Sequence, residues 1–320
     1  MTVTTQKGTQ YVMFVGLLAC VLPLVAHGQE QAKDPVPTQA PSGNTQAEPK
    51  PEDAPKPPTL DVKPGSPAVK ATEEHEPLSP IRRLPKHIWQ DQVHIWTSPF
   101  HTSRQDVKWW AIFGGATVAF VATDRWTSKQ LPNTQSQITA GNWASRLGAI
   151  YTIVPIDAAM YVIGTTKHND RLRETGLIGE EALIDSFIVD NILKTAFDRQ
   201  RPTEGNGNGA FWQGNGRFWN SGSSFPSGHA IHTWSLASVI AHEYPHPIII
   251  PILVYTYAMG VNIARFAARQ HFASDIVAGS AMGWFIGDFV YAKRHNEGLD
   301  APQRSAMQRL LAHVHFGGME

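Results

Sequence analysis

Apolar stretches of helical length follow one another between about residues 106 and 295. Segments rich in Gly, Pro, Asn and charged residues separate them, as expected for the ends of helices. The stretches cover residues 107–122, 144–165, 175–197, 229–243, 247–267 and 271–292. The chain lacks the sustained alternation of apolar and polar positions that strands require. The sequence therefore predicts an all-α domain over residues 106–295, a bundle of about six core helices, followed by a C-terminal tail over 296–320.

The first 105 residues have a different texture. Residues 1–28 combine a weakly basic start with an apolar run and small residues near position 28, which predicts a secretory signal peptide. An uncleaved N-terminal anchor and a lipoprotein site at Cys20 are the alternatives. Residues 29–80 contain 12 of the 23 prolines. They are predicted to be a disordered linker, because they lack the apolar side chains that would offset the entropy of ordering. Residues 81–105 form a lead-in segment.

Composition narrows the choice of partners. The formal net charge is zero, so the chain as a whole gives no reason to expect a nucleic-acid partner, and any basic site must be local. Cys20 is the single cysteine, which excludes an intramolecular disulfide and a cysteine-bound metal. Candidate chemistry therefore has to be sought in clusters of other polar residues, and the sequence contains three such clusters.

The first cluster runs from Lys194 to Pro202 and contains two cations seven residues apart. Seven residues are two helical turns, so Lys194 and Arg201 are expected to project from one face of a helix. Pro202 disfavours helix at the preceding residue, so the helix is predicted to end at Arg201. Two cations would then point the same way from a helix end. The plainer alternative is a solvated basic helix terminus, which favours the helix dipole.

The second cluster, from Phe225 to His229, directly precedes an apolar helical run. Ser227 is a good residue to cap the helix, and Gly228 would let a ligand approach the backbone. The free N–H groups at a helix start bind anions, and His229 would lie beside an anion bound there. The alternative is a capping sequence followed by a partly buried histidine.

The third cluster contains Arg265, His271 and Asp275. His271 and Asp275 are four residues apart at the predicted start of a helix, so they should share a face. The aspartate would then accept a hydrogen bond from Nδ1–H of His271 and leave Nε2 free as an electron-pair donor, as a nucleophilic histidine requires. The alternative is an exposed pair that contributes only a few tenths of a kcal/mol.

A long loop over residues 203–224 separates the first two clusters and is rich in Gly, Asn and Ser. Loops of this length in compact domains are usually functional or disordered. The loop either faces the substrate or is a connector that its aromatic residues hold against the body of the domain. Taken together, the clusters supply three cations, a helix start and two histidines with one carboxylate. That set suits phosphoryl transfer, which depends on positioning and on stabilising negative charge.

The three clusters resemble the motifs of the type 2 phosphatidic acid phosphatase superfamily. Its motifs are Lys-x6-Arg-Pro, Pro-Ser-Gly-His and Ser-Arg-x5-His-x3-Asp, and this chain matches them in the same order over residues 194–275. One position departs from the pattern, because Ala264 stands where the family often has serine. The difference bears on positioning and substrate choice. Asp198 and Arg199 lie within the first motif, but the pattern gives them no role.

The resemblance implies a phosphatase that requires no metal or other cofactor. His271 would attack phosphorus, with Asp275 as its orienting partner, and a phosphohistidine would form. His229 would protonate the leaving oxygen and then activate the hydrolytic water. The phosphoryl oxygens would be bound by the remaining motif residues, which are Lys194, Arg201, Arg265, Ser227 and Gly228.

The substrate would be a phosphomonoester or a diphosphate, including those attached to lipids. Two other functions have compatible residues. Vanadium-dependent haloperoxidases resemble this superfamily, and they hold vanadate where the phosphate would bind. A non-catalytic phospholipid-binding module is the second, although binding alone would need only the cations.

The predicted location is a bacterial-type cell envelope, with membrane association. Lys167, Arg171 and Arg173, together with Lys293 and Arg294, would lie on the side opposite the motifs. Positive charge favours the cytoplasmic side, so the active site would face outward, into the periplasm or at the outer face of the membrane. Four acidic residues within 175–197 would be costly at the bilayer centre. A five-span or monotopic domain therefore fits better than six spans, and a soluble periplasmic domain is the remaining alternative.

Overall fold

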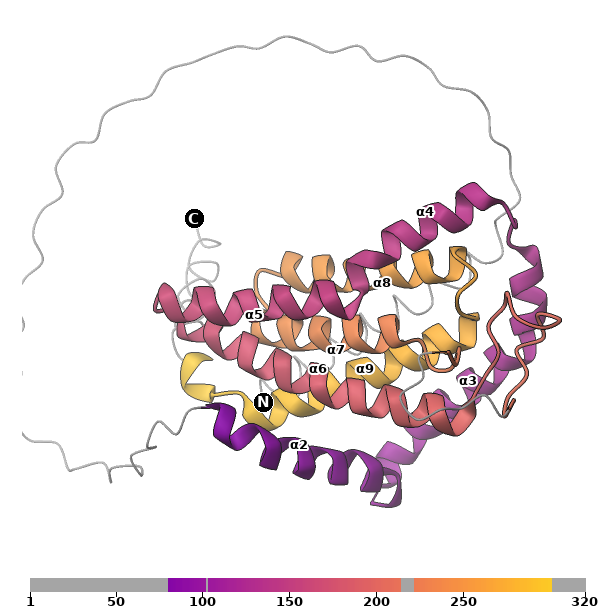
Figure 1. Cartoon of the computed structure of the whole chain (residues 1–320). Coiled ribbons are helices and arrows are strands. Elements are labelled where there is room, and N and C mark those ends of the chain that lie inside the picture. Colours follow the sequence, from indigo (N-terminus) through magenta and orange to yellow (C-terminus); the bar gives the residue numbers. More distant parts are fainter. Residues whose placement is uncertain (1–79, 102, 214–221, 301–320) are drawn as a thin grey trace, which may run out of the picture. The chain divides into compact units, whose positions relative to one another are not determined.

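The computed structural model describes residues 80–101, 103–213 and 222–300. The signal peptide and nearly all of the predicted linker lie outside these residues, as does most of the C-terminal tail. All regular structure in the described residues is helical, which confirms the all-α prediction. The α-helices, shown in Figure 1, are α2 (Pro80–Thr97), α3 (Arg104–Gln130), α4 (Gln135–Ser145), α5 (Ile150–Thr166), α6 (Asp170–Phe197), α7 (Gly228–Glu243), α8 (Ile249–Ala267) and α9 (Ala273–Arg294).

Short polar side chains begin several of these helices. The Thr134 hydroxyl accepts a hydrogen bond from the amide of Gln137 at the start of α4, and the Asn169 side chain accepts one from the amide of Leu172 at the start of α6. Ser227 caps α7 in the same way, as its position in the sequence predicted. The Ser227 cap explains why α7 begins within one residue of its predicted start.

One predicted helix is divided in two. The stretch 144–165 becomes the end of α4, the 3-10 turn η2 (Arg146–Gly148) and α5. Gly148 lies so close to Val261 of α8 that a Cβ atom there would be 2.3 Å from the Val261 Cγ1 atom. The turn therefore brings the backbone against α8 at a point where only glycine fits.

The first motif differs from its prediction at the end of α6. The helix ends at Phe197, and Asp198 takes a left-handed conformation, with φ of 35°. The amide of Gln200 then donates to the Ala210 carbonyl, which turns the chain into the following loop. Lys194 is helical, but Arg201 lies three residues beyond Asp198. The prediction that both cations project from one helix face is therefore wrong.

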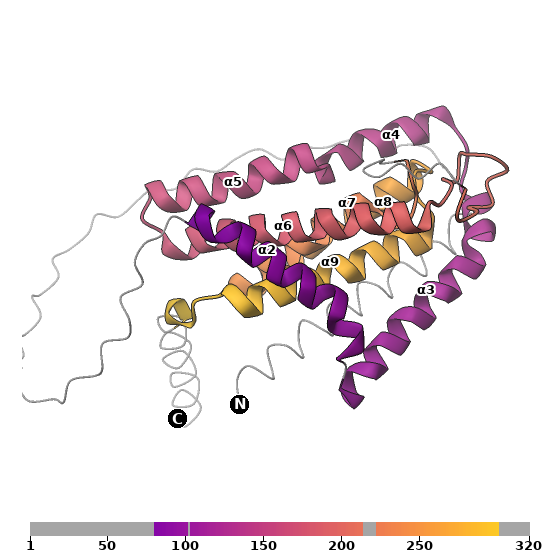
Figure 2. The same ribbon diagram turned by 60° about the horizontal axis from the view of Figure 1, so that its bottom comes forward.

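Helix α7 lies at the centre of the bundle and packs against α6, α8 and α9 (Figure 2). Its contact with α9 is a seam of glycines spaced four residues apart, at Gly279, Gly283 and Gly287. A Cβ atom on Gly283 would lie 2.1 Å from the Ile231 carbonyl oxygen, and one on Gly287 would lie 2.3 Å from that of Ser235. Small residues at this spacing let two helix backbones approach closely.

Replacing Gly283 with alanine is expected to lower the free energy of unfolding by about 2–3 kcal/mol, because the two helices would have to separate to admit the methyl group. Thermal unfolding followed by circular dichroism would measure the change. Gly260→Ala in α8 is the matched control, since nothing lies within 4 Å of the added Cβ atom. It should be neutral or stabilise by about 0.5–1 kcal/mol. Equal destabilisation by both variants would contradict the close approach.

Helix α2 lies against α6 in both views (Figures 1 and 2) and is joined to the bundle by buried ion pairs. The Asp91 carboxylate is 2.6 Å from Arg294 and 3.2 Å from Lys293, and Arg294 also pairs with Glu181 of α6. Gln92 donates to Asp185 at 2.9 Å. Two of the acidic residues that make α6 a poor membrane span, Glu181 and Asp185, thus have partners within the protein, on α9 and α2.

Candidate active site

The three motifs meet where α6 and α8 end and α7 and α9 begin. The Ser227 amide donates to the Asp275 carbonyl at 3.0 Å, which joins the second motif to the third. Arg201 donates to the Gln270 side chain at 2.8 Å, which joins the first motif to the third. A Cβ atom on Gly228 would lie 2.8 Å from the Lys194 ammonium nitrogen, so the first and second motifs also touch. The structure therefore assembles one site from segments up to 81 residues apart in the chain (194 to 275).

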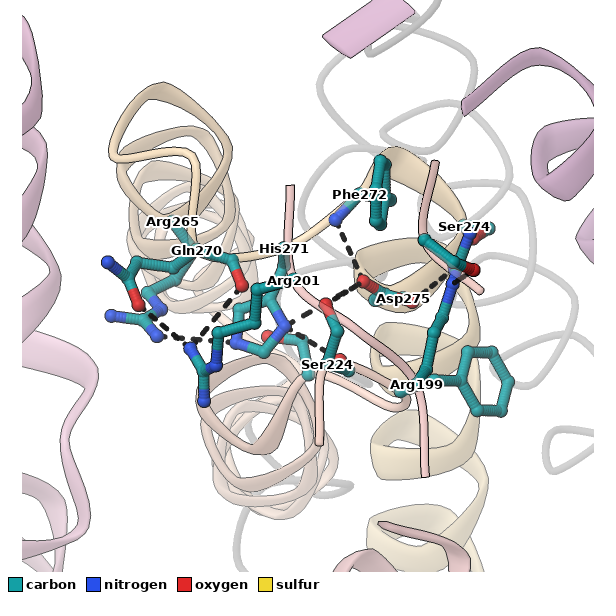
Figure 3. A network of polar contacts seen from close by, with 12 residues as sticks. Arg199, Arg201, Ser224, Arg265, Gln270, His271, Phe272, Ser274 and Asp275 are labelled. Carbon is teal, nitrogen blue, oxygen red and sulfur yellow. Dashed lines mark hydrogen bonds and ion pairs between the residues drawn. The ribbon is translucent and has the colours of Figure 1, made fainter. Parts of the chain in front are cut away.

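His271 lies between two groups of polar side chains, with Arg265, Gln270 and Arg201 on one side and Asp275 and Arg199 on the other (Figure 3). Its side chain is 2% exposed. Nδ1 is 2.8 Å from the Ser224 carbonyl oxygen, and Nε2 is 3.3 Å from the Arg265 guanidinium. A carbonyl only accepts and a guanidinium only donates, so both contacts require the proton on Nδ1 and the lone pair on Nε2. That is the tautomer of a nucleophile.

Asp275 does not make the predicted hydrogen bond to His271. The distance from Nδ1 of His271 to the Asp275 carboxylate is 3.9 Å, because His271 precedes α9 rather than lying in its first turn. The carboxylate instead accepts from the Phe272 amide at 2.8 Å and from the Ser224 hydroxyl at 2.6 Å. Its link to His271 therefore passes through Ser224, which the sequence did not single out.

The three predicted cations lie near enough to His271 for the charge of each to lower its pKa. Lys194 is buried and pairs with Asp190 at 2.8 Å. Arg201 also donates to the Gly222 carbonyl at 3.1 Å, and Arg265 lies 3.5 Å from the Ser145 hydroxyl. Each cation is thus positioned by neighbouring groups while it contributes positive charge to the same site.

The start of α7 supplies the remaining predicted residues. Ser227 is fully buried, and its hydroxyl accepts from the Ala230 amide at 3.5 Å. His229 lies in the first turn, and its carbonyl accepts from the Thr233 hydroxyl. A helix start next to cations favours the binding of an anion, and this role of Gly228 and His229 stays a prediction.

Comparison with known proteins identifies the fold that carries this site. The family model of the PAP2 superfamily matches residues 181–298, which include all three motifs. Residues 181–298 are therefore similar in sequence to the PAP2 superfamily. The match confirms the resemblance to type 2 phosphatidic acid phosphatases that the motifs indicated.

Two similar proteins have names that state an activity. The chain is 29% identical over 114 residues to a lipid A 1-phosphatase of Rhizobium etli, covering 35% of this chain and 48% of that protein. It is 25% identical over 158 residues to a lipid A 1-phosphatase of Porphyromonas gingivalis, covering 48% and 32%. The chain therefore matches about half or less of the length of these relatives.

A solved structure also resembles the chain. It is a transmembrane PAP2 type phosphatidylglycerolphosphate phosphatase from Bacillus subtilis, 17% identical, with a TM-score of 0.41. The similarity covers 66% of this chain and 95% of that one.

Arg199 is a buried residue of the site to which the PAP2 motifs give no role. Its guanidinium pairs with Asp275 at 2.5 Å and with Asp124 of α3 at 2.8 Å. The signal in the sequence was the extra arginine within the first motif, but its partner Asp124 lies 75 residues away. No local pattern could have joined the two.

Both histidines of the site have depressed pKa values. Burial, followed by the charge of Arg265, lowers the pKa of His229 to about 3. Burial and the neighbouring cations lower the pKa of His271 well below its usual value, so its Nε2 lone pair is available at neutral pH. A bound phosphate dianion would offset the cations and raise the pKa of His229, which is what a proton donor in the bound complex requires.

A potential metal-binding cluster lies away from the PAP2 motifs. Among the described residues, ligand atoms of Glu174, Glu243 and His295 lie within 4.8 Å of one another. They belong to the start of α6, the end of α7 and the residue after α9, so they stand at the other ends of the helices that form the site. His295 already contacts both glutamates, at 3.1 and 2.9 Å, and Arg171 pairs with Glu243.

Proposed function

We propose that this chain is a metal-independent phosphatase that hydrolyses a phosphomonoester or diphosphate of a membrane lipid through a phosphohistidine at His271. The observation that supports it best is the environment of His271. Nδ1 is held by a carbonyl, and the Nε2 lone pair points toward Arg265 with two further cations nearby. A binding site for phosphate would need the cations but not this oriented lone pair.

In the proposed first step, the phosphoryl oxygens take up the Arg265 hydrogen bond and free Nε2 of His271. Nε2 forms a bond to phosphorus while the bond from phosphorus to the leaving oxygen breaks, and His229 gives that oxygen its proton. Lys194, Arg201 and the Gly228 amide stabilise the charge on the phosphoryl oxygens.

In the second step, neutral His229 takes a proton from water, whose oxygen bonds to phosphorus. The bond between phosphorus and Nε2 breaks, and inorganic phosphate leaves. His229 is thus protonated again after the second displacement, as it was in the substrate complex, and each of the two displacements transfers the same phosphoryl group.

The lipid part of the proposal is supported by the relatives and by exposed apolar side chains. The similar proteins are phosphatases of lipid A and of phosphatidylglycerolphosphate, by their names. Two helical segments, Gln135–Thr166 and Ile249–Ala267, are long and apolar enough to cross a membrane. Only 28% and 44% of their apolar windows are buried in the protein. Core helices of soluble proteins are mostly buried, so this exposure favours contact with lipid.

The function is tested by hydrolysis assays on the full chain with a lipid phosphomonoester, a lipid diphosphate and p-nitrophenyl phosphate. We expect phosphate release that vanadate inhibits and EDTA leaves unchanged, since vanadate can form five bonds around His271 as in the transition state. Absence of hydrolysis, with phospholipid binding retained, would favour the binding module. Halide oxidation with vanadate and peroxide would favour the haloperoxidase. If EDTA abolished hydrolysis and a divalent ion restored it, the metal-independent mechanism would be wrong.

We further propose that the domain is held in the membrane with its site facing outward. The cations that suggested this orientation are partly used inside the protein, since Arg171 pairs with Asp300 and Arg294 with Asp91. Lys167 remains exposed on the side opposite the motifs.

Carbonate extraction should therefore leave the protein in the membrane fraction, and a periplasmic reporter fused after residue 80 should be active. Fusions after residues 170 and 300 would then count the crossings. Full release by carbonate would exclude an inserted helix, and a cytoplasmic signal from the first fusion would exclude export of the linker.

A further inference from the structure

Arg199 has a contact for each part of its guanidinium, and none of these contacts is with the cations of the site. Nε donates to the Gly209 carbonyl at 3.1 Å, Nη1 donates to Ser274 at 2.6 Å and to Asp275 at 2.5 Å, and Nη2 donates to Asp124 at 2.8 Å. The side chain is 1% exposed. A buried arginine with this many charged hydrogen bonds has a fixed position.

The loop after the first motif encloses the guanidinium. The central guanidinium carbon of Arg199 lies 4.6 Å from the centre of the Phe211 ring and 4.4 Å from the centre of the Phe272 ring, which belongs to the third motif. Gly209 has φ of 64°, and a Cβ atom there would lie 2.5 Å from the Phe272 ring. The described part of the loop is thus a structural support for Arg199, which corresponds to the connector alternative for this segment.

The backbone of Arg199 is tied to the residue that orients His271. The Ser224 amide donates to the Arg199 carbonyl at 2.7 Å, and the Ser224 hydroxyl donates to Asp275. The Ser224 carbonyl is the group that accepts from Nδ1 of His271. Asp124, which pairs with Arg199, also accepts hydrogen bonds from the amide and the hydroxyl of Ser274.

We infer that Arg199 is a positioning residue, which with Asp124 fixes Asp275 and Ser224 so that the Ser224 carbonyl orients His271 for attack. This inference rests on the proposed phosphatase function, and it adds Asp124 of α3 to the residues that position His271. Arg199 itself touches neither the phosphoryl group nor His271.

The charge of Arg199 also affects the protonation of Asp275. Burial raises the pKa of Asp275 to about 6, Arg199 opposes that rise, and Asp124 adds to it. His271 and Arg201 are the other charged or titratable groups that face this carboxylate. Removing Arg199 would raise the pKa of Asp275 further, so the acidic limb of the pH–kcat profile should move to higher pH.

Arg199→Met in the full chain, assayed in detergent, is expected to lower kcat about 100-fold, because small displacements of a reacting group have effects of this size. KM and the inhibition constant of phosphate should stay within about threefold of wild type. The vanadate inhibition constant should rise with the loss in kcat, because vanadate bonds to Nε2 and phosphate does not. Arg201→Met removes one of the proposed phosphate-binding cations, so it should instead raise KM and the inhibition constant of phosphate.

Arg269→Met is the matched control, since Arg269 donates to the backbone carbonyls of Ser128 and Leu131 and has no contact with Asp275. Its kcat and pH profile should match wild type even if it unfolds at a lower temperature. Should Arg199→Met fail to fold, Asp124→Asn should lower kcat about tenfold and raise the vanadate inhibition constant. Its acidic limb should move to lower pH instead, because the charge of Asp124 raises the pKa of Asp275. Adding Asp124→Asn to a folded Arg199→Met should produce little further loss.

Three results would overturn the inference. They are wild-type kcat in a folded Arg199→Met variant, equal effects of Arg199→Met and Arg269→Met, or a kcat loss with an unchanged vanadate constant and pH profile. If the wild-type chain hydrolyses none of the phosphates, the proposed function fails and the inference fails with it. If the wild type is active and Arg199→Met is equally active, only the inference fails.

Discussion

His271→Ala should abolish phosphate release, with a fall in kcat of roughly 10⁶-fold, the size seen when a covalent nucleophile is removed. The expectation follows from the position of Nε2, which is the lone-pair atom that faces the cations. Rapid quench of the wild type with phosphorus-labelled substrate should give a labelled protein, and peptide mapping should place the label on His271. The label should be lost in acid and stable in base, as a phosphoramidate is.

The matched control is His101→Ala, at an exposed histidine that follows α2 and η1 (Ser98–Phe100). It should retain wild-type turnover and labelling. A second variant, Asp275→Asn, should keep weak activity, because the Ser224 carbonyl still accepts from Nδ1 when the carboxylate is neutral. Label on Ser227, or wild-type turnover by His271→Ala, would show that the nucleophile is another group.

His229→Ala should lower kcat on an alkyl phosphate by roughly 10²–10⁴-fold, the contribution of a general acid. The loss on p-nitrophenyl phosphate should be much smaller, because nitrophenolate leaves without being protonated. His229 lies in the first turn of α7, where the proposed phosphate site begins. Measuring both substrates with the same variant separates proton donation from a general disturbance of the site.

The pKa of His229 provides a second measurement. Burial, and then the charge of Arg265, lowers this pKa to about 3. Binding of a phosphate dianion should raise it, so binding should take up protons from solution. Calorimetry in buffers of different ionisation enthalpy would detect this uptake in the wild type and not in His229→Ala. Equal losses on both substrates, without proton uptake, would rule out the role of general acid.

The sequence predicted those features that depend on neighbouring residues in the chain. Helical periodicity and the Ser227 cap are local, and they placed α7 within one residue of its observed start. The predicted end of α6 at Arg201 was wrong, because Asp198 takes a left-handed conformation and the Gln200 amide donates to the Ala210 carbonyl. The spacing of two cations gives no information about either feature.

The orientation of His271 could not have been predicted either. Its partner is a backbone carbonyl, and since every residue has one, nothing in the residue type of Ser224 reveals that role. The pairing of Asp124 with Arg199 joins positions 75 residues apart through the fold alone. What the motifs did predict is the set of groups that gather around the lone pair of His271.

The glycine seam between α7 and α9 has a consequence for how this protein tolerates variation. A Cβ atom on Gly279 would meet the Ser227 carbonyl at 2.8 Å, at the end of the seam nearest the site. The distance between the segment that carries His229 and the segment that carries His271 is therefore set by direct contact between their backbones. In a library of single substitutions, Gly279 should be as intolerant as the reacting residues although it never meets the substrate. The exposed surfaces of α4 and α5 should accept the exchange of one apolar side chain for another, so selection for new substrates should change those surfaces and leave the seam untouched.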